Sequence, residues 1–119
     1  MKTGTVQICK KEYTVVVNTA LLMAIEDRTG KPAGEAFDDI LSSGSLKDVM
    51  WLLHEMMVQG KAYCDLVGMP CEEPPAIKDM GTLIGVDEFK DLIKVIADSS
   101  KDSQEPDIDS ISKNQQATE

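Results

Sequence analysis

VMWLLHEMMV, residues 49–58, holds eight apolar residues in ten positions. Ser45 precedes this stretch and suits a helix N-cap, and Asp48 follows where the positive end of the helix dipole favours a carboxylate. Gly60 is expected to end the helix, which predicts a helix over residues 46–59. A helix that is apolar on nearly all sides is either buried on most sides or offers a second face to a partner. This helix therefore dominates both the fold and the search for function.

Upstream of this helix, residues 5–17 have the pattern of a β-hairpin. Alternating and β-branched residues lie on both sides of Lys10 and Lys11, which mark a turn of two to four residues. The pair lacks the Asn-Gly or Asp-Gly signature, so the sequence leaves the turn type open. A lone hairpin is unstable in water, and this one is expected to pack on the helices that follow.

Four further helices are expected from apolar residues at helical spacing and from glycine or proline at the segment ends. They cover residues 19–29, 35–42, 76–84 and 86–98. Asn18 or Thr19 caps the first of them. The intervening stretch 60–75 is rich in Gly and Pro and is expected to be irregular, although residues 62–67 have enough apolar character for one or two helical turns. The predicted fold is mainly α with a short N-terminal β-hairpin (α+β), a small bundle of four to five helices in a compact domain over residues 1–98.

The composition changes after Asp98. Residues 99–119 are rich in Ser, Gln, Asp and Lys, and their only large apolar residues are Ile108 and Ile111. Such a segment buries too little apolar surface to offset its ordering entropy. We therefore expect an acidic, disordered tail over residues 99–119.

The bulk composition excludes several classes of function. The chain has 119 residues and a net charge of −9, which argues against phosphate-backbone binding and against an anionic membrane surface. We expect no secretory leader, because residues 1–20 lack an apolar h-region, and no membrane span, because no run approaches about 18 apolar residues. Three cysteines, Cys9, Cys64 and Cys71, are an odd number, which is typical of reduced thiols in the cytoplasm.

No catalytic, metal or cofactor site is expected. His54 is the one histidine, and the sequence nominates no nucleophile or orienting group beside it. His54, Cys64 and Cys71 lack a fourth ligand and the paired short spacing of a zinc site. The glycines are dispersed and form no phosphate-binding loop. We therefore predict a binding protein rather than an enzyme.

The predicted partner-binding residues all lie on the apolar helix: Trp51, Leu52, Met56 and Val58. One interpretation places Met50, Trp51, Leu53 and Met57 in the core and leaves the complementary face, Leu52, Met56 and Val58, to a partner helix. Methionine-rich surfaces suit such binding. The other interpretation is that the whole helix is core, and an exposed face would equally suit self-association.

The order of hairpin, capped helix, short helix, apolar helix, short helix and amphipathic helix resembles the tail assembly chaperones of long-tailed phages and prophages. The likeness covers residues 4–98 and is carried by four stretches: the strand pair around Val6–Ile8 and Glu12–Val15, then Asn18–Lys31, Ser45–Leu53, and the short helix together with Asp87–Ile96. The Pro-rich Gly60–Pro75 stretch is longer than the family pattern.

The resemblance implies a function. Tail assembly chaperones bind the long, apolar, helical tape-measure protein before the tail tube polymerises round it, and then leave. It implies a tape-measure or other tail protein as the partner, and a bacterial host. The apolar surface itself also suits a homo-oligomer, and the odd cysteine count favours the cytoplasm. The alternative from the sequence is a small regulatory or adaptor protein of a bacterial mobile element that also acts by protein–protein binding.

Overall fold

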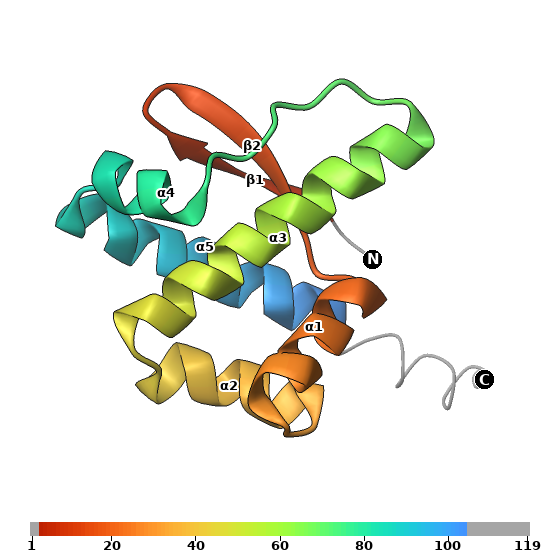
Figure 1. Cartoon of the computed structure of the whole chain (residues 1–119), viewed down its shortest axis with the longest axis vertical. Coiled ribbons are helices and arrows are strands. Elements are labelled where there is room, and N and C mark those ends of the chain that lie inside the picture. Colours follow the sequence, from red (N-terminus) through yellow and green to blue (C-terminus); the bar gives the residue numbers. More distant parts are fainter. Residues whose placement is uncertain (1–2, 105–119) are drawn as a thin grey trace.

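An N-terminal hairpin and five helices are present in the computed structural model, which describes residues 3–104 and the side chains of residues 3–98. In chain order they are β1 (Thr3–Ile8), β2 (Lys11–Val16), α1 (Thr19–Thr29), α2 (Ala33–Ser43), α3 (Leu46–Val67), α4 (Ile77–Leu83) and α5 (Val86–Gln104). The predicted fold class, mainly α with a short β-hairpin, is confirmed. In Figure 1, α3 crosses the molecule diagonally, with the hairpin above it, α1 and α2 below it and α5 behind it.

The hairpin closes through a two-residue turn. Ile8 pairs with Lys11 in the antiparallel register, and Cys9 and Lys10 between them have φ of 49° and 70°. Positive φ at both central residues is the requirement of a type I′ turn, whose twist matches that of the strands. The turn type that the sequence left open is therefore settled without the usual Asn-Gly pair. The turn is formed by Cys9 and Lys10 rather than by the predicted Lys10 and Lys11, because Lys11 already pairs in β2. Alternate residues such as Val6 and Ile8 point to the core.

The caps of α1 explain why its predicted bounds, residues 19–29, are confirmed. The Asn18 Oδ1 atom accepts from the Leu21 N–H at 2.9 Å, so Asn18 rather than Thr19 is the N-cap. Gly30 ends the helix at φ 72°, in the left-handed region that glycine enters without strain. The chain then passes Pro32 and begins α2.

The expected end of α3 at residue 59 is wrong, because the helix continues to Val67 and closes at Gly68, whose φ is 78°. Gly60 lies inside the helix and is buried. A Cβ atom built on it would collide with the carbonyl oxygen of Thr14 in β2. Glycine at position 60 thus serves the close approach of helix and strand, and the helix tolerates it because tertiary packing outweighs its poor propensity.

The last helix also extends beyond its predicted end. The helix predicted over residues 86–98 runs to Gln104, so the first six residues of the expected disordered tail are helical. Each residue added to an existing helix gains a backbone hydrogen bond without a new nucleation cost, which lets a helix run past its apolar stripe. The rest of the tail, residues 105–119, lies outside the described residues.

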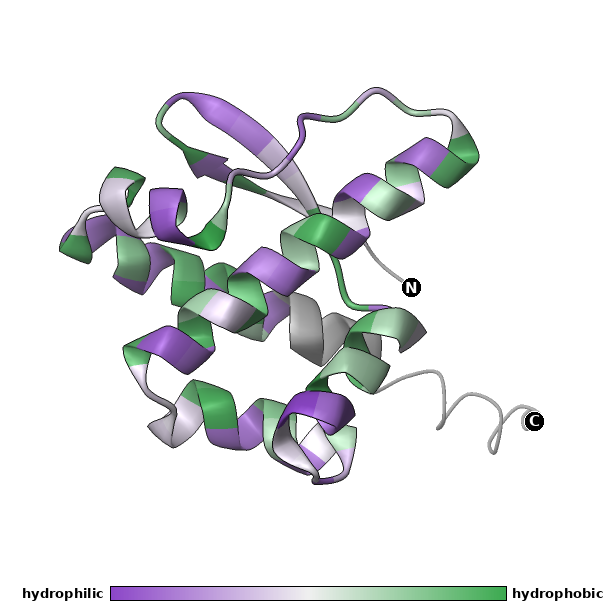
Figure 2. Ribbon diagram, in the orientation of Figure 1, coloured by the Kyte–Doolittle hydropathy of each residue, from purple (hydrophilic) through white to green (hydrophobic). Residues whose placement is uncertain are grey.

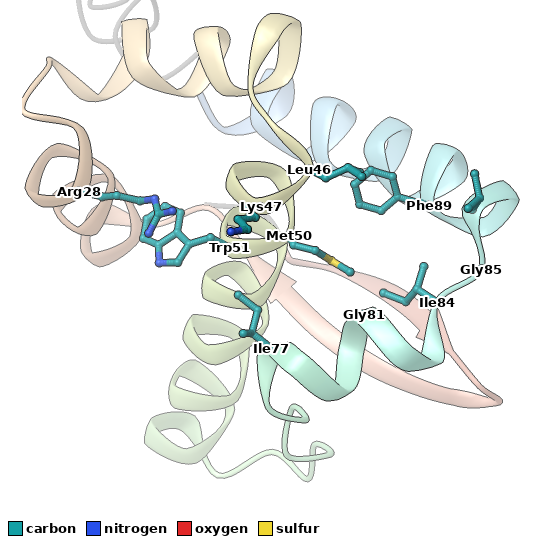
Figure 3. A pocket seen from close by; sticks show the side chains of 11 residues that line it. Arg28, Leu46, Lys47, Met50, Trp51, Ile77, Gly81, Ile84, Gly85 and Phe89 are labelled. Carbon is teal, nitrogen blue, oxygen red and sulfur yellow. The ribbon is translucent and has the colours of Figure 1, made fainter.

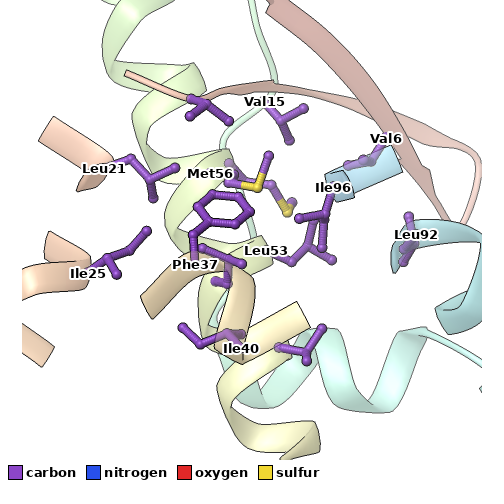
Figure 4. Packing of buried hydrophobic residues seen from close by; sticks show 14 of the residues in the cluster. Val6, Val15, Leu21, Ile25, Phe37, Ile40, Leu53, Met56, Leu92 and Ile96 are labelled. Atoms are coloured by element: carbon purple, nitrogen blue, oxygen red, sulfur yellow. The ribbon is translucent and has the colours of Figure 1, made fainter. Parts of the chain in front are cut away.

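The core lies where α3 meets β2, α1 and α2, and α5 covers it beside β1 (Figure 4). Phe37, Leu53 and Met56 are completely buried at its centre. Each such side chain contributes about 1.5–3 kcal/mol of transfer free energy relative to exposure. None of the helices within residues 3–104 combines the length and apolar character needed to cross a bilayer.

Candidate functional site

The predicted partner-binding residues do not share one exposed face. Leu52 and Met56 are completely buried in the core, so the expected binding face of Leu52, Met56 and Val58 is corrected. The reason is that α3 is covered on that side by the hairpin and by α1 and α2. Val58 is half-buried and lies beside a different hollow, together with His54 and Pro74. Only Trp51 borders a large apolar depression.

That depression, which we call the apolar groove, has a volume of about 610 Å³. This lies within the usual range of ligand-binding pockets, roughly 300–1,000 Å³. It is lined by Arg28, Leu46, Lys47, Met50, Trp51, Ile77, Gly81, Ile84, Gly85, Val86 and Phe89. Most of these side chains are apolar, and Figure 3 shows Met50 extending from α3 toward Ile84.

The groove is built by three helix segments: the first two turns of α3, the short α4 and the start of α5. Ser45 fixes the start of α3, because its Oγ accepts from the Asp48 N–H at 3.2 Å. The start of α5 is fixed in a similar way by Gly85, whose N–H donates to Glu88 Oε1 at 2.9 Å. This contact is one half of a capping box. The two caps place Leu46 and Val86 at the rim of the groove.

The rim exposes an unusual amount of apolar surface. Leu46 is 69% exposed and Val86 is 79% exposed, and Ile77 between them is 39% exposed. Figure 2 shows hydrophobic segments of ribbon, in green, among hydrophilic ones where α4 meets α5. Single exposed apolar residues are ordinary, but a contiguous set around a hollow is typical of a binding surface.

One end of the groove carries a cation. The Arg28 guanidinium lies 4.6 Å from the centroid of the Trp51 ring, and its Nη2 is 3.1 Å from Asp48 Oδ1. Both partners of the ion pair are about 40% exposed, at 39% and 41%, so its stabilising effect is small. The guanidinium also lies over the face of the Trp51 ring, within the range of a cation–π interaction. The groove therefore has apolar walls and an ion-paired arginine at one end.

The cysteines depart from the prediction of three reduced thiols. Cys64 and Cys71 form a disulfide, and Cys9 is an exposed free thiol. Seven positions separate the two bonded cysteines, and the unexpected extension of α3 brings Cys64 beside the returning chain. Within the described part of the chain, no group of three or more His, Cys, Asp or Glu side chains is placed to hold a metal ion.

Sequence reasoning missed most of the groove. Leu46, Ile77, Val86 and Phe89 were treated as helix boundaries or as parts of core-facing stripes. The available signal was an apolar residue at the first position of three successive helices. A side chain at that position is usually exposed to solvent, so an apolar one there indicates an exposed apolar surface.

Comparison with family models, with curated proteins and with solved structures found no match to this chain.

Proposed function

We propose that the chain is a tail-assembly-chaperone-like binding protein. Its apolar groove shields apolar helical segments of a phage tape-measure protein, or of another tail protein, in the bacterial cytoplasm before assembly. The observation that supports this most directly is the groove itself, with exposed Leu46 and Val86 at its rim. The identity of the partner comes from the resemblance of residues 4–98 to tail assembly chaperones.

The shape of the groove favours a helix as the bound element. Its walls are helices, and an amphipathic helix that lies between helices presents side chains at i, i+3, i+4 and i+7 to such a hollow. The adaptable side chain of Met50 on one wall accommodates anchors of different shape. A helix of the tape-measure protein that would otherwise aggregate is thereby removed from water.

Co-expression with an apolar fragment of the tape-measure protein encoded in the same prophage tests this proposal. The chain should raise the soluble fraction of the fragment, and Leu46→Gln should reduce that gain. Leu66→Gln is the matched control, because Leu66 also lies on α3 and is 89% exposed, yet it is at the opposite end of the helix and outside the groove. The emission of Trp51, the one tryptophan, reports occupancy of the groove directly.

The outcomes separate cleanly. Loss of rescue with Leu46→Gln and normal rescue with Leu66→Gln supports binding in the groove. Equal rescue by both variants would place the binding surface elsewhere. No rescue by the unaltered chain would contradict the chaperone function.

A further inference from the structure

The segment that joins α3 to α4, residues 68–76, is tied down by the disulfide. We call it the link segment. Cys64 lies in the last turns of α3 and is completely buried, whereas Cys71 lies in the link segment and is half-buried. The bond therefore fastens an irregular stretch of chain to the rigid end of a long helix.

The polar contacts of the link segment are weak by comparison. The Lys11 Nζ atom is 4.0 Å from Glu72 Oε1, with both side chains more than half exposed, so this ion pair contributes little. Cys71 Sγ is 3.2 Å from the Thr14 hydroxyl, a contact to β2 that depends on the position of the sulfur. Pro74 and Pro75 border a shallow hollow beside α3.

The link segment leads directly into one wall of the apolar groove. Helix α4 begins at Ile77, and it supplies Ile77 and Gly81 to the groove lining. It has only seven residues, and Met80 is its one completely buried side chain. Such a short helix has little stability of its own. Its position depends on the packing of Met80 against the core, on a contact of the Cys9 thiol with the Leu83 carbonyl at 3.6 Å, and on the link segment that leads into it.

We propose that the Cys64–Cys71 disulfide is a redox control on the apolar groove, an inference that rests on the proposed function of that groove. In the oxidised chain the tied link segment holds α4 in place and the groove is preorganised. In the reduced chain α4 moves more freely and the groove binds its partner more weakly, because the partner must then order the wall as it binds.

The reduction is an ordinary thiol–disulfide exchange with a dithiol reductant. A thiolate of the reductant attacks Cys71 Sγ, because Cys64 is completely buried. The Sγ–Sγ bond breaks, and Cys64 leaves with the electron pair and takes a proton. The second thiol of the reductant then displaces Cys71 as a thiol and closes a disulfide within the reductant. Two electrons and two protons pass from the dithiol to the chain.

The test compares the full chain before and after treatment with dithiothreitol. Alkylation of the denatured, oxidised chain should modify Cys9 alone, and alkylation after reduction should modify all three cysteines. Hydrogen exchange of the Asp79 and Met80 amides, which donate to the Ala76 carbonyl, should accelerate about tenfold on reduction as local opening becomes easier.

The affinity for the tape-measure fragment, read from Trp51 emission, should fall about tenfold as preorganisation is lost.

Two variants sharpen the comparison. Cys71→Ser should behave as the reduced chain in both states. Cys9→Ser should keep the full response, because Cys9 is outside the disulfide and a serine hydroxyl can still donate to the Leu83 carbonyl, as the Cys9 thiol does at 3.6 Å. Three alkylated thiols in the untreated chain, or α4 exchange that is equal in both states, would overturn the inference. Equal fragment affinity in both states would overturn the redox control and leave the proposed function standing. If α4 exchange is faster in the reduced chain but the fragment binds neither state, the proposed function is overturned and the redox control of α4 stands.

Discussion

The two halves of α3 are built from the same kinds of residue but meet different surroundings. The first turns, from Leu46 to Trp51, border the open groove, and their apolar side chains are largely half-buried or exposed. The middle of the helix, around Met57 and Gly60, lies against β2 with no space left at the crossing. One helix therefore combines a rigid anchor with a surface that is free to bind, and apolar composition alone does not distinguish the two.

Substitution at the crossing should have the largest effect. Gly60→Ala inserts a Cβ against the Thr14 carbonyl, and neither backbone can move without disturbing the strand or the helix. We expect a loss of more than about 3 kcal/mol in the free energy of unfolding, above the usual range of overpacking effects because the collision is with backbone. Urea denaturation followed by circular dichroism measures it.

Gly81→Ala is the matched control for that substitution. Gly81 also lies inside a helix, but a Cβ built there meets no atom within 4 Å. Helix propensity then acts alone and stabilises the chain by up to about 1 kcal/mol. A destabilisation of similar size in both variants would show that the close crossing is not what makes position 60 special.

The same contrast should appear with methionine. Met57 is 1% exposed in the core, and Met50 is half-buried at the groove. Met57→Ala should cost about 3 kcal/mol, from lost transfer free energy and a residual cavity, whereas Met50→Ala should cost less than about 1 kcal/mol. Thermal unfolding of the two variants compares them, and equal losses would mean that the groove is closed in solution.

The smallest effect is expected at the end of the groove that carries Arg28. Arg28→Ala removes the stacking on Trp51 and the ion pair with Asp48, both partly exposed, and should cost less than about 1 kcal/mol. The freed Trp51 ring should become wetter, with a red-shifted emission maximum. Unchanged emission would show that the guanidinium does not orient the ring.

The sequence was a good guide wherever local chemistry decides the structure. The α1 helix was predicted to the residue, because Asn18 and Gly30 are strong end signals that need no tertiary information. The hairpin was also recognised, since alternation reports directly which face is buried.

Prediction failed where distant residues decide the outcome. Gly60 has the local signature of a helix end, and only the approach of Thr14 shows why it lies inside a helix. Leu52 and Met56 were assigned to a partner because their burial depends on elements that lie far away in the sequence. The groove was missed for the same reason: its walls come from α3, α4 and α5, and periodicity within one helix does not show which neighbours leave a face open.

The closeness of α3 to β2 also supplies a way of finding relatives that overall similarity would miss. A chain that keeps this crossing has to keep a residue without a Cβ at the position of Gly60, fifteen positions after the capping Ser45 and inside the helix. Upstream of this helix, the chain also has a capping Asn18 and a helix-ending Gly30, which are twelve positions apart. This spacing of two caps and one buried glycine is a short fingerprint by which divergent genomes can be screened.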